Sequence, residues 1–213
     1  MYPTRQAAVR SWRLVLRHAR LFRAFRRVRI QVRAIRPISD LHALQADLVA
    51  DRMGIDPAEA RALIDAVVYA RLPDALRGVR THPGVQRALT ELRERGAKLG
   101  VLSDMPPDAK LRDMGLRGFA CAVTSEATDY LKPNPEPFRY VAELLDVRPE
   151  QVLYVGNHYR YDILGAGAVG MLTAHHARRA EQSSRADLTF LRYDSLMPAI
   201  RAAGIRLPSG RVS

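Results

Sequence analysis

Residues 152–166 read VLYVGNHYRYDILGA, and the interpretation of the whole chain starts from this stretch. Its first four residues, 152–155, are apolar and rich in β-formers, a run too short for a helix and typical of a buried strand. Gly156 ends the run, and Asn157 and Asp162 follow across a turn that leads into a predicted helix. Open α/β sheets place ligands at such strand ends, so the stretch predicts a seat for a hard cation such as Mg2+. The alternative is that Asn157 forms a turn and Asp162 caps a helix.

Strands and helices alternate through the second half of the chain. Short apolar runs predict strands, and the amphipathic or proline-initiated stretches between them predict helices. The predicted strands are 99–102, 120–124, 152–155, 171–174 and 188–191, and the predicted helices are 83–95, 107–114, 135–145, 159–168 and 194–203. This order predicts an α/β fold in three layers, with right-handed crossovers and a parallel sheet covered by helices on both faces.

Residues 1–80 contain helical patterns and no convincing strand. Apolar side chains recur every three or four positions over residues 5–35, and Asp40 and Gly54 carry the start and stop signals of a further helix. We therefore divide the chain into a helical region, residues 1–80, and an α/β core, residues 81–213.

Positive charge is concentrated near the start of the chain. The net charge is +12 at pH 7, and residues 1–39 hold eleven arginines and neither Asp nor Glu, so the remainder is close to neutral. A basic amphipathic helix can bind a membrane surface or nucleic acid. Arginine stems also commonly pack along a helix of their own protein, and we favour that interpretation, which implies no nucleic-acid partner.

Cysteine content and hydropathy indicate the cellular compartment in which the protein is expected. The single cysteine, Cys121, excludes an intrachain disulfide and lies in an apolar run, which indicates a buried small residue in a reducing compartment. No apolar stretch approaches the length of a membrane span, and no signal-peptide core is present. We therefore expect a cytoplasmic protein.

Two further strand ends carry polar side chains. Ser103 and Asp104 follow the predicted strand 99–102, where a hydroxyl and the amides of the next turn can hold a phosphate oxygen. Lys132 lies in LKPNPEPF, where each proline forces the residue before it out of the helical region. A lysine on so stiff a loop is suited to neutralising a phosphate or a carboxylate, whereas a solvated surface lysine needs no such frame.

These features together resemble a known family. Ser103 after a strand, Lys132 in its proline-rich loop, and GNHYRYDILGA are similar to the second, third and fourth motifs of the haloacid dehalogenase-like (HAD) hydrolase superfamily, over residues 80 to about 195. The helical region resembles that family's cap domain. The resemblance implies a Mg2+-dependent phosphatase acting on a small phosphorylated substrate, in which an aspartate attacks phosphorus to form an aspartyl-phosphate.

The same resemblance assigns residues to roles. It makes Ser103 and Lys132 catalytic and assigns phosphate binding to Ser103, Asp104 and Lys132. It makes Asn157 and Asp162 the Mg2+ ligands. Asparagine replaces the usual acidic ligand at position 157, which should weaken metal binding.

The first family motif, DxDx(T/V), is absent from the sequence. Residues 1–4 resemble the segment that follows it, so we expect the sequence to begin a few residues late and the chain as given to be inactive. Without the central strand that carries this motif, the chain should be destabilised or should borrow a strand from a second copy as a homodimer. Two alternatives stay open: a non-catalytic member that binds a phosphorylated ligand or a protein, and binding to anionic surfaces through the arginine-rich helix.

Overall fold

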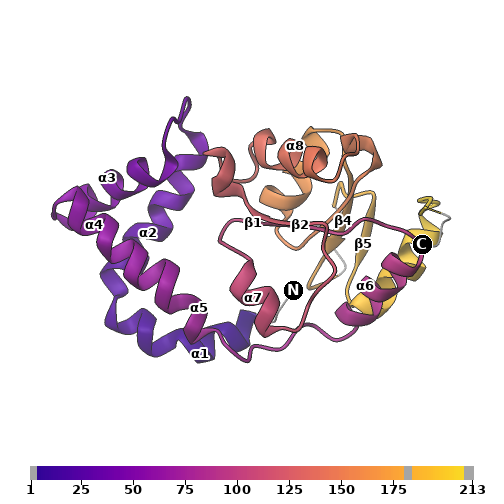
Figure 1. Cartoon of the computed structure of the whole chain (residues 1–213), viewed down its shortest axis with the longest axis horizontal. Helices are drawn as coiled ribbons and strands as arrows, with labels where there is room; N and C mark the ends of the chain where they lie inside the picture. The colour runs from indigo at the N-terminus through magenta and orange to yellow at the C-terminus, as the bar shows by residue number, and fades with distance from the viewer. Residues whose placement is uncertain (1–3, 180–183, 209–213) are drawn as a thin grey trace.

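The structure is a computed structural model that describes residues 4–179 and 184–208. Helices α1 to α5 lie together at one end of an elongated molecule, and all the labelled strands lie with helices α6 to α8 towards the other end (Figure 1). We call the first group the cap and the second group the core.

The cap consists of helices. They are α1 (Thr4–Arg17), α2 (Ala19–Gln31), a 3-10 turn (Val32–Ala34), α3 (Leu41–Met53), α4 (Pro57–Leu63), a π-helical continuation (Ile64–Arg71) and α5 (Leu72–Ala75). The predicted signals of α3 are confirmed, since the Asp40 carboxylate accepts the Ala43 N–H at 2.8 Å and Gly54 adopts a φ of +65°. The single pattern over residues 5–35 is therefore divided between two consecutive helices that meet at His18.

Most of the apolar stripe of α2 is used for packing inside the cap. The buried residues on this stripe and its extension are Leu21, Ala24, Phe25, Val28 and Val32. Leu131 of the core belongs to the same cluster, so the cap is packed onto the core. On α1, Trp12 and Leu16 are 50% and 65% exposed. Within residues 4–179 and 184–208, no helix combines the length and apolar character needed to cross a lipid bilayer.

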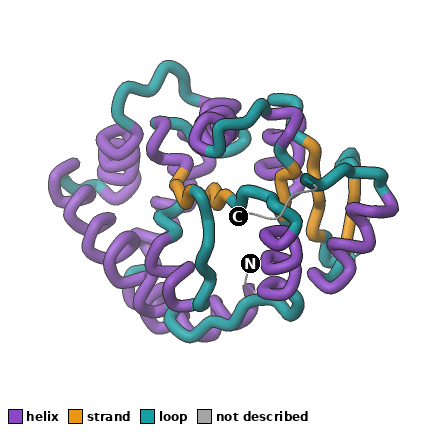
Figure 2. Tube along the Cα trace, turned by 45° about the vertical axis from the view of Figure 1, so that its right-hand side comes forward, coloured by secondary structure: helices purple, strands orange, loops and turns teal. Residues whose placement is uncertain are grey.

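The core strands form two separate parallel sheets. The strands are β1 (Gly100–Ser103), β2 (Cys121–Thr124), β3 (Leu153–Gly156), β4 (Leu172–His176) and β5 (Leu188–Phe190). β1 pairs with β2, and β3, β4 and β5 pair in that order. No strand in the described part of the chain joins β1 to β3, and Figure 2 shows the strands in two groups.

Helices cover the strands on two faces. They are α6 (Val85–Glu94), α7 (Asp108–Asp113), α8 (Pro135–Leu144), α9 (Leu164–Ala168) and α10 (Leu196–Ala202). α8 packs on β1, β2 and α9, whereas α10 packs on β5 and shares an apolar cluster with α6. The predicted α/β architecture with parallel strands between helical layers is therefore confirmed.

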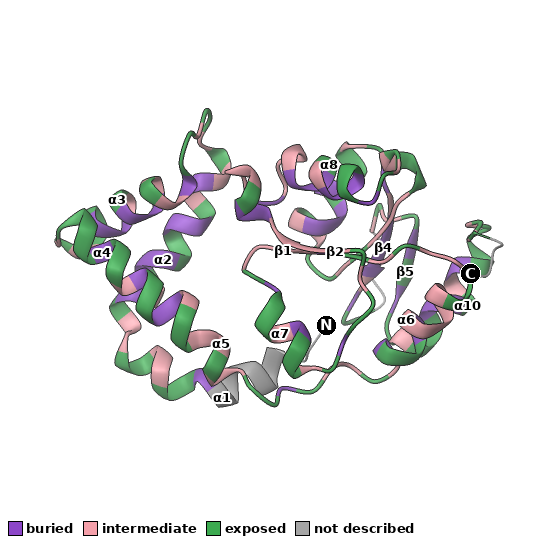
Figure 3. Cartoon of the chain, in the orientation of Figure 1, coloured by how far each residue is buried: buried purple, intermediate pink, exposed green. Residues whose placement is uncertain are grey.

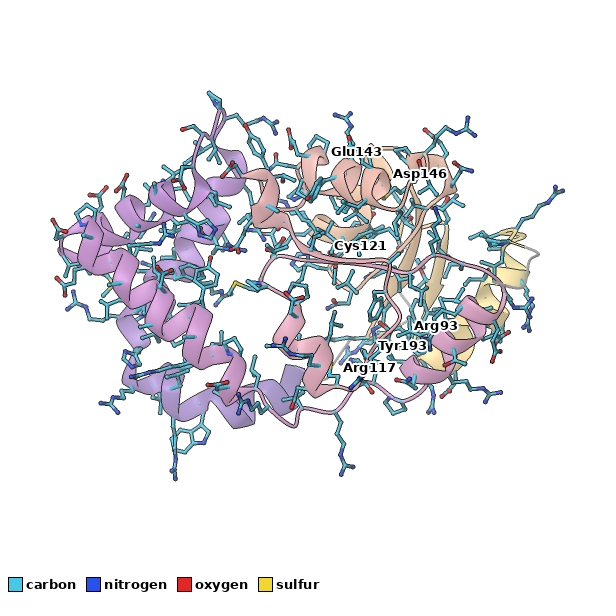
Figure 4. All side chains as sticks on the ribbon, in the orientation of Figure 1. Arg93, Arg117, Cys121, Glu143, Asp146 and Tyr193 are labelled. Carbon is cyan, nitrogen blue, oxygen red and sulfur yellow. The ribbon has the colours of Figure 1, made fainter. Side chains whose placement is uncertain are left out.

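The residues of β1 and β2 are unusually exposed to solvent for strands of a parallel sheet. Val101 is the one fully buried residue among the eight in these two strands, and both strands are mostly coloured as intermediate in Figure 3. Cys121, labelled in Figure 4, is half-buried, so our expectation that it is buried is wrong. Strands of a parallel sheet are normally buried on both faces. The exposure follows from the separation of these two strands from β3, β4 and β5.

Candidate active site

Lys132 and Asp162 form a buried ion pair where two strand ends meet. Lys132 Nζ lies 2.7 Å from Asp162 Oδ1, and the two side chains are 10% and 8% exposed. Lys132 also donates to the hydroxyl of Tyr154 at 3.2 Å. The lysine comes from the loop between β2 and α8, whereas the aspartate belongs to the π-helical turn Tyr159–Ile163 that follows β3. The sequence predicted that these two residues share a site, and they are in direct contact.

The second oxygen of Asp162 closes the turn after β3. Asp162 Oδ2 accepts the backbone N–H groups of Asn157 at 3.1 Å and of His158 at 2.9 Å. The helix itself is capped by His158, whose Nδ1 accepts the N–H of Tyr161 at 3.3 Å. Gly156 is required here because a Cβ at that position would overlap the side chain of Asp162.

The ion pair controls the protonation states at the site. Burial by itself lowers the pKa of Lys132, but Tyr154 and Asp162 outweigh it, so this pKa lies above its ordinary value. Burial by itself raises the pKa of Asp162, but Lys132 and the two amides outweigh it, so this pKa lies below its usual range. Burial raises the pKa of Tyr154. At neutral pH the lysine and the aspartate are therefore charged, and the tyrosine is neutral.

Ser103 and Asp104 lie at the end of β1, on the same side of the core. The Ser103 hydroxyl oxygen accepts a backbone N–H two residues on at 3.2 Å, which leaves its proton for another acceptor. The Asp104 carboxylate accepts the Ser125 hydroxyl at 2.7 Å and pairs with Arg33. Arg33 contacts both Asp104, which follows β1, and the ring of Tyr161, which follows β3, so the ends of β1 and β3 lie at one edge of the core.

The two predicted metal ligands form only part of a metal site. Asn157 is exposed, and the Asp162 carboxylate that accepts its N–H is already bonded to Lys132 and to a second amide. The described residues contain no cluster of three or more His, Cys, Asp or Glu side chains that could hold a metal ion. Mg2+ prefers about six oxygen ligands, several of them water. The donor set therefore fits Mg2+ only if a further carboxylate is added to it.

Two cap arginines reach the site, and the sequence analysis did not identify them. Arg29 pairs with the buried Glu126 and donates to the carbonyl of Asp104. Arg33 pairs with the Asp104 carboxylate, and its guanidinium carbon lies 4.3 Å from the ring centroid of Tyr161. Burial lowers the pKa of Arg33. Arg29 lies in α2 and Arg33 in the 3-10 turn that follows it, but residues 1–39 hold eleven arginines, so spacing alone could not single these two out.

Comparison with known families bears directly on this arrangement. The family model of haloacid dehalogenase-like hydrolases matches residues 15–170. The chain belongs to this family. The match includes Ser103, Lys132 and Asp162 together with most of the cap, and it confirms the resemblance drawn from the motifs.

Curated relatives in the HAD family include phosphatases. A glyceraldehyde 3-phosphate phosphatase from Methanopyrus kandleri is 35% identical over 141 residues, which are 64% of this chain and 60% of that protein. A pyrophosphatase from Bacillus cereus is 32% identical over 102 residues, 45% of this chain and 46% of that protein. The chain thus spans about half of each of these relatives.

Solved structures of the family have the same fold. A 2-haloacid dehalogenase from Pseudomonas syringae superposes with a TM-score of 0.61 at 25% identity, over 92% of this chain and 89% of that chain. An L-2-haloacid dehalogenase from Xanthobacter autotrophicus gives a TM-score of 0.64 at 20% identity, over 95% and 94%. A β-phosphoglucomutase from Clostridium difficile gives 0.62 at 16% identity, over 87% and 89%.

Proposed function

We propose that this chain carries most of the active site of a Mg2+-dependent phosphatase that hydrolyses a small phosphomonoester. The observation that supports this most is the buried Lys132–Asp162 pair beside Ser103 at neighbouring strand ends. Relatives named as a phosphatase and a pyrophosphatase support phosphoryl chemistry over the other reactions of the family.

In this proposal, Ser103 and Lys132 bind the phosphoryl group. The Ser103 hydroxyl donates to one phosphoryl oxygen, and Lys132 neutralises negative charge that develops during transfer. Asp104 takes part through its backbone N–H, because its carboxylate is already paired with Arg33 and would repel a phosphate. Asp162 holds the lysine in position through their ion pair.

Asp162 and Asn157 would hold the Mg2+ ion together with one further carboxylate. When bound, the ion supplies positive charge that stabilises the phosphoryl oxygens. The carboxylates described at the site, Asp104 and Asp162, are both engaged in ion pairs. Transfer through a covalent intermediate needs an attacking nucleophile, so we expect the chain as described to be inactive until an aspartate is supplied.

Hydrolysis of p-nitrophenyl phosphate tests the proposal. The chain alone should be inactive, and a version extended at its N-terminus by an apolar strand ending in Asp-x-Asp should turn over with Mg2+ and stop with EDTA. In the extended protein, Lys132→Met should lower kcat by about 10²–10³. Lys98→Met is the matched control, since Lys98 donates at 2.8 Å to the carbonyl of Leu145, and it should retain activity. An extended, folded protein without phosphatase activity would refute the proposal.

A non-catalytic phosphate-binding member is the second candidate. The pairing of Asp104 with Arg33 and of Asp162 with Lys132 favours it, because neither carboxylate is available for attack. It predicts that the extended protein binds inorganic phosphate in a calorimeter and that Lys132→Met abolishes the binding, with no turnover of any phosphomonoester. Turnover would exclude this candidate.

Binding to an anionic surface is the third candidate. It is favoured by Trp12 and Leu16, which are exposed on α1 beside Arg13 and Arg17. It predicts salt-sensitive binding to vesicles of phosphatidylserine that Trp12→Asp removes. Absent or salt-independent binding would exclude it.

A further inference from the structure

Arg29 connects the cap to the main chain of the loop that follows Ser103. Arg29 lies in α2 of the cap, whereas Ser103 is the last residue of β1 in the core (Figure 1). The Nη2 atom of the Arg29 guanidinium donates a hydrogen bond to the carbonyl oxygen of Asp104. These two residues are 75 positions apart in the sequence, so the packing of the cap on the core brings them together.

The peptide group between Asp104 and Met105 extends this contact to Ser103. The carbonyl oxygen that accepts from Arg29 and the N–H of Met105 belong to one planar, conjugated peptide unit. The Met105 N–H donates to the Ser103 hydroxyl oxygen at 3.2 Å. Linked hydrogen bonds polarise one another, so a cation at the carbonyl makes the N–H a stronger donor. The charge of Arg29 therefore acts on Ser103 through a single peptide group.

The hydrogen bond from Met105 fixes the orientation of the Ser103 hydroxyl. Its oxygen accepts the Met105 N–H, so its own proton is directed to a different acceptor. Under the proposed function, that acceptor is a phosphoryl oxygen on which charge develops during transfer. A hydroxyl whose oxygen is polarised by a strong donor is itself a stronger donor to such an oxygen.

Partners from both halves of the chain hold the Arg29 guanidinium in place. Its Nη1 atom donates to Gln45 Oε1 at 3.0 Å and pairs with the carboxylate of Glu126. Glu126 also accepts the Tyr69 hydroxyl at 2.7 Å. Arg29, Gln45 and Glu126 are 8%, 1% and 5% exposed, so water competes little for these contacts. Because the guanidinium is a rigid planar fork, fixing Nη1 also aims Nη2 at the carbonyl.

The side chain of Asp104 is also held, partly by the cap. Asp104 Oδ1 accepts the Ser125 hydroxyl at 2.7 Å, and Oδ2 pairs with Arg33 from the turn after α2. The main-chain oxygen and both side-chain oxygens of Asp104 therefore have partners, two of which are cap arginines. The orientation of the Asp104–Met105 peptide thus depends on the cap being packed against the core.

We propose that Arg29 is a positioning residue for Ser103, and that it transmits the docking of the cap to the Ser103 hydroxyl through the Asp104–Met105 peptide. In this role Arg29 acts only through the peptide and makes no contact with the phosphoryl group. When the cap moves away from the core, the carbonyl loses its cationic donor and the hydroxyl loses its fixed orientation. The effect on catalysis rests on the proposed function, whereas the connection from Arg29 to Ser103 does not.

Nuclear magnetic resonance of the Met105 amide in the purified chain tests the connection without substrate. Labelling with 15N-methionine reduces the spectrum to the six methionines, and Met105→Leu identifies the signal of interest. Arg29→Lys keeps a positive charge beside Glu126 but lacks the second nitrogen of the fork, so Asp104 loses its donor. The Met105 amide proton should therefore shift upfield. An unchanged Met105 signal would overturn the proposal.

Two further variants complete this test. Arg36→Lys is the matched control, because Arg36 also links the cap to the core, through Glu136, and it should leave the Met105 signal in place. Tyr69→Phe is the milder variant for use if Arg29→Lys does not fold. It removes a single hydrogen bond to Glu126 and should shift the Met105 signal in the same direction by less. Equal shifts in the Arg36 variant would show a general effect of the cap and overturn the proposal.

Kinetics of the N-terminally extended protein test the consequence for catalysis. With p-nitrophenyl phosphate, Arg29→Lys should lower kcat about 10–100-fold and change KM little, because a misdirected hydroxyl is missed mainly in the transition state. In a Ser103→Ala background, the same substitution should change kcat by about twofold or less, since the hydroxyl through which Arg29 acts is absent. Equal losses in the two backgrounds would indicate a purely structural role and overturn positioning.

The two measurements separate this proposal from the proposed function. If the extended parent protein does not turn over, the phosphatase is refuted, and the Met105 signal still decides whether Arg29 is connected to Ser103. If the extended protein turns over but the Met105 signal does not respond to Arg29→Lys, the phosphatase is supported and the positioning role is overturned.

Discussion

The Lys132–Asp162 pair combines positioning of the site with stability of the core. Lys132 comes from a loop and Asp162 from the π-helical turn after β3, their side chains are about nine-tenths buried, and Asp162 also accepts two backbone amides. A buried pair contributes little net stability compared with an apolar pair, but the loss of one member leaves the other charge uncompensated. Replacement of either residue should therefore destabilise the chain, because the other residue remains as a buried charge.

We expect Lys132→Met to lower the free energy of unfolding by about 3–5 kcal/mol, because Asp162 would be left as a lone buried charge. Urea unfolding measures the change. Lys98→Met, which removes a single hydrogen bond to a carbonyl, should cost about 1 kcal/mol. If both variants unfolded at the same urea concentration, the pair would have no special role.

The same pair should make stability depend on pH at both extremes. The pKa of Asp162 is lower in the folded chain, so its stabilisation is present above the unfolded pKa of about 3.9 and is lost as pH falls through the folded pKa. The pKa of Lys132 is raised, so its stabilisation is present below about pH 10.4 and is lost as pH rises through the folded pKa. The stability difference between the parent chain and Asp162→Asn should therefore shrink below about pH 4. A difference that stays constant down to pH 2 would contradict this.

At the scale of elements, the turn after β3 depends on close contact between Gly156 and Asp162. A Cβ on residue 156 would overlap the Asp162 side chain, whereas a Cβ on Gly167 would meet only Thr173 at 3.9 Å. Gly156→Ala should thus displace Asp162 and lower the thermal midpoint. Gly167→Ala lies within α9 and should raise stability by about 0.5–1 kcal/mol. Calorimetry of both variants measures this contrast, and equal midpoints would argue against the contact.

Helix α2 holds the cap on the core through buried charge. Arg29 of α2 pairs with Glu126 after β2, and Tyr69 of the cap donates to the same carboxylate at 2.7 Å. Burial raises the pKa of Tyr69, which keeps it a neutral donor. These contacts connect α2 and the π-helical segment Ile64–Arg71 of the cap to the turn that follows β2 in the core.

We expect Glu126→Ala to destabilise the chain by about 3–5 kcal/mol, since it leaves the buried charge of Arg29 without a carboxylate partner. Hydrogen exchange should speed up first in α2 and the π-helical segment of the cap. Arg61→Ala removes the exposed ion pair with Asp65 and should cost about 0–1 kcal/mol. Unchanged exchange in α2 of the Glu126 variant would show that apolar packing alone holds the cap.

At the scale of the whole molecule, the core should be weakest where its sheet is divided. β1 and β2 form a two-stranded sheet with one fully buried residue, whereas β3 to β5 form three paired strands over apolar clusters. Two-stranded sheets are marginally stable in water. Amides of β1 and β2 should therefore exchange with solvent well before those of β4, as measured by mass spectrometry. Equal protection in all strands would contradict the divided core.

Much of the fold could be predicted because its signals are local. The apolar run 152–155 coincides with β3 within one residue, and Asp40 and Gly54 end their helix as capping chemistry requires. The motif residues were found because their spacing matches a family pattern. Cys121 was expected to be buried, but burial depends on neighbouring strands, and in the described residues β2 pairs with β1 alone.

By itself, the sequence determined the order of elements and the parallel α/β class. These follow from hydrophobic period, turn chemistry and strand order, which are properties of short segments. Tertiary structure alone decided that Arg29 and Arg33, among eleven arginines, reach the site. Contacts between distant segments depend on how helices and strands pack in space, and no local pattern in the chain records that packing.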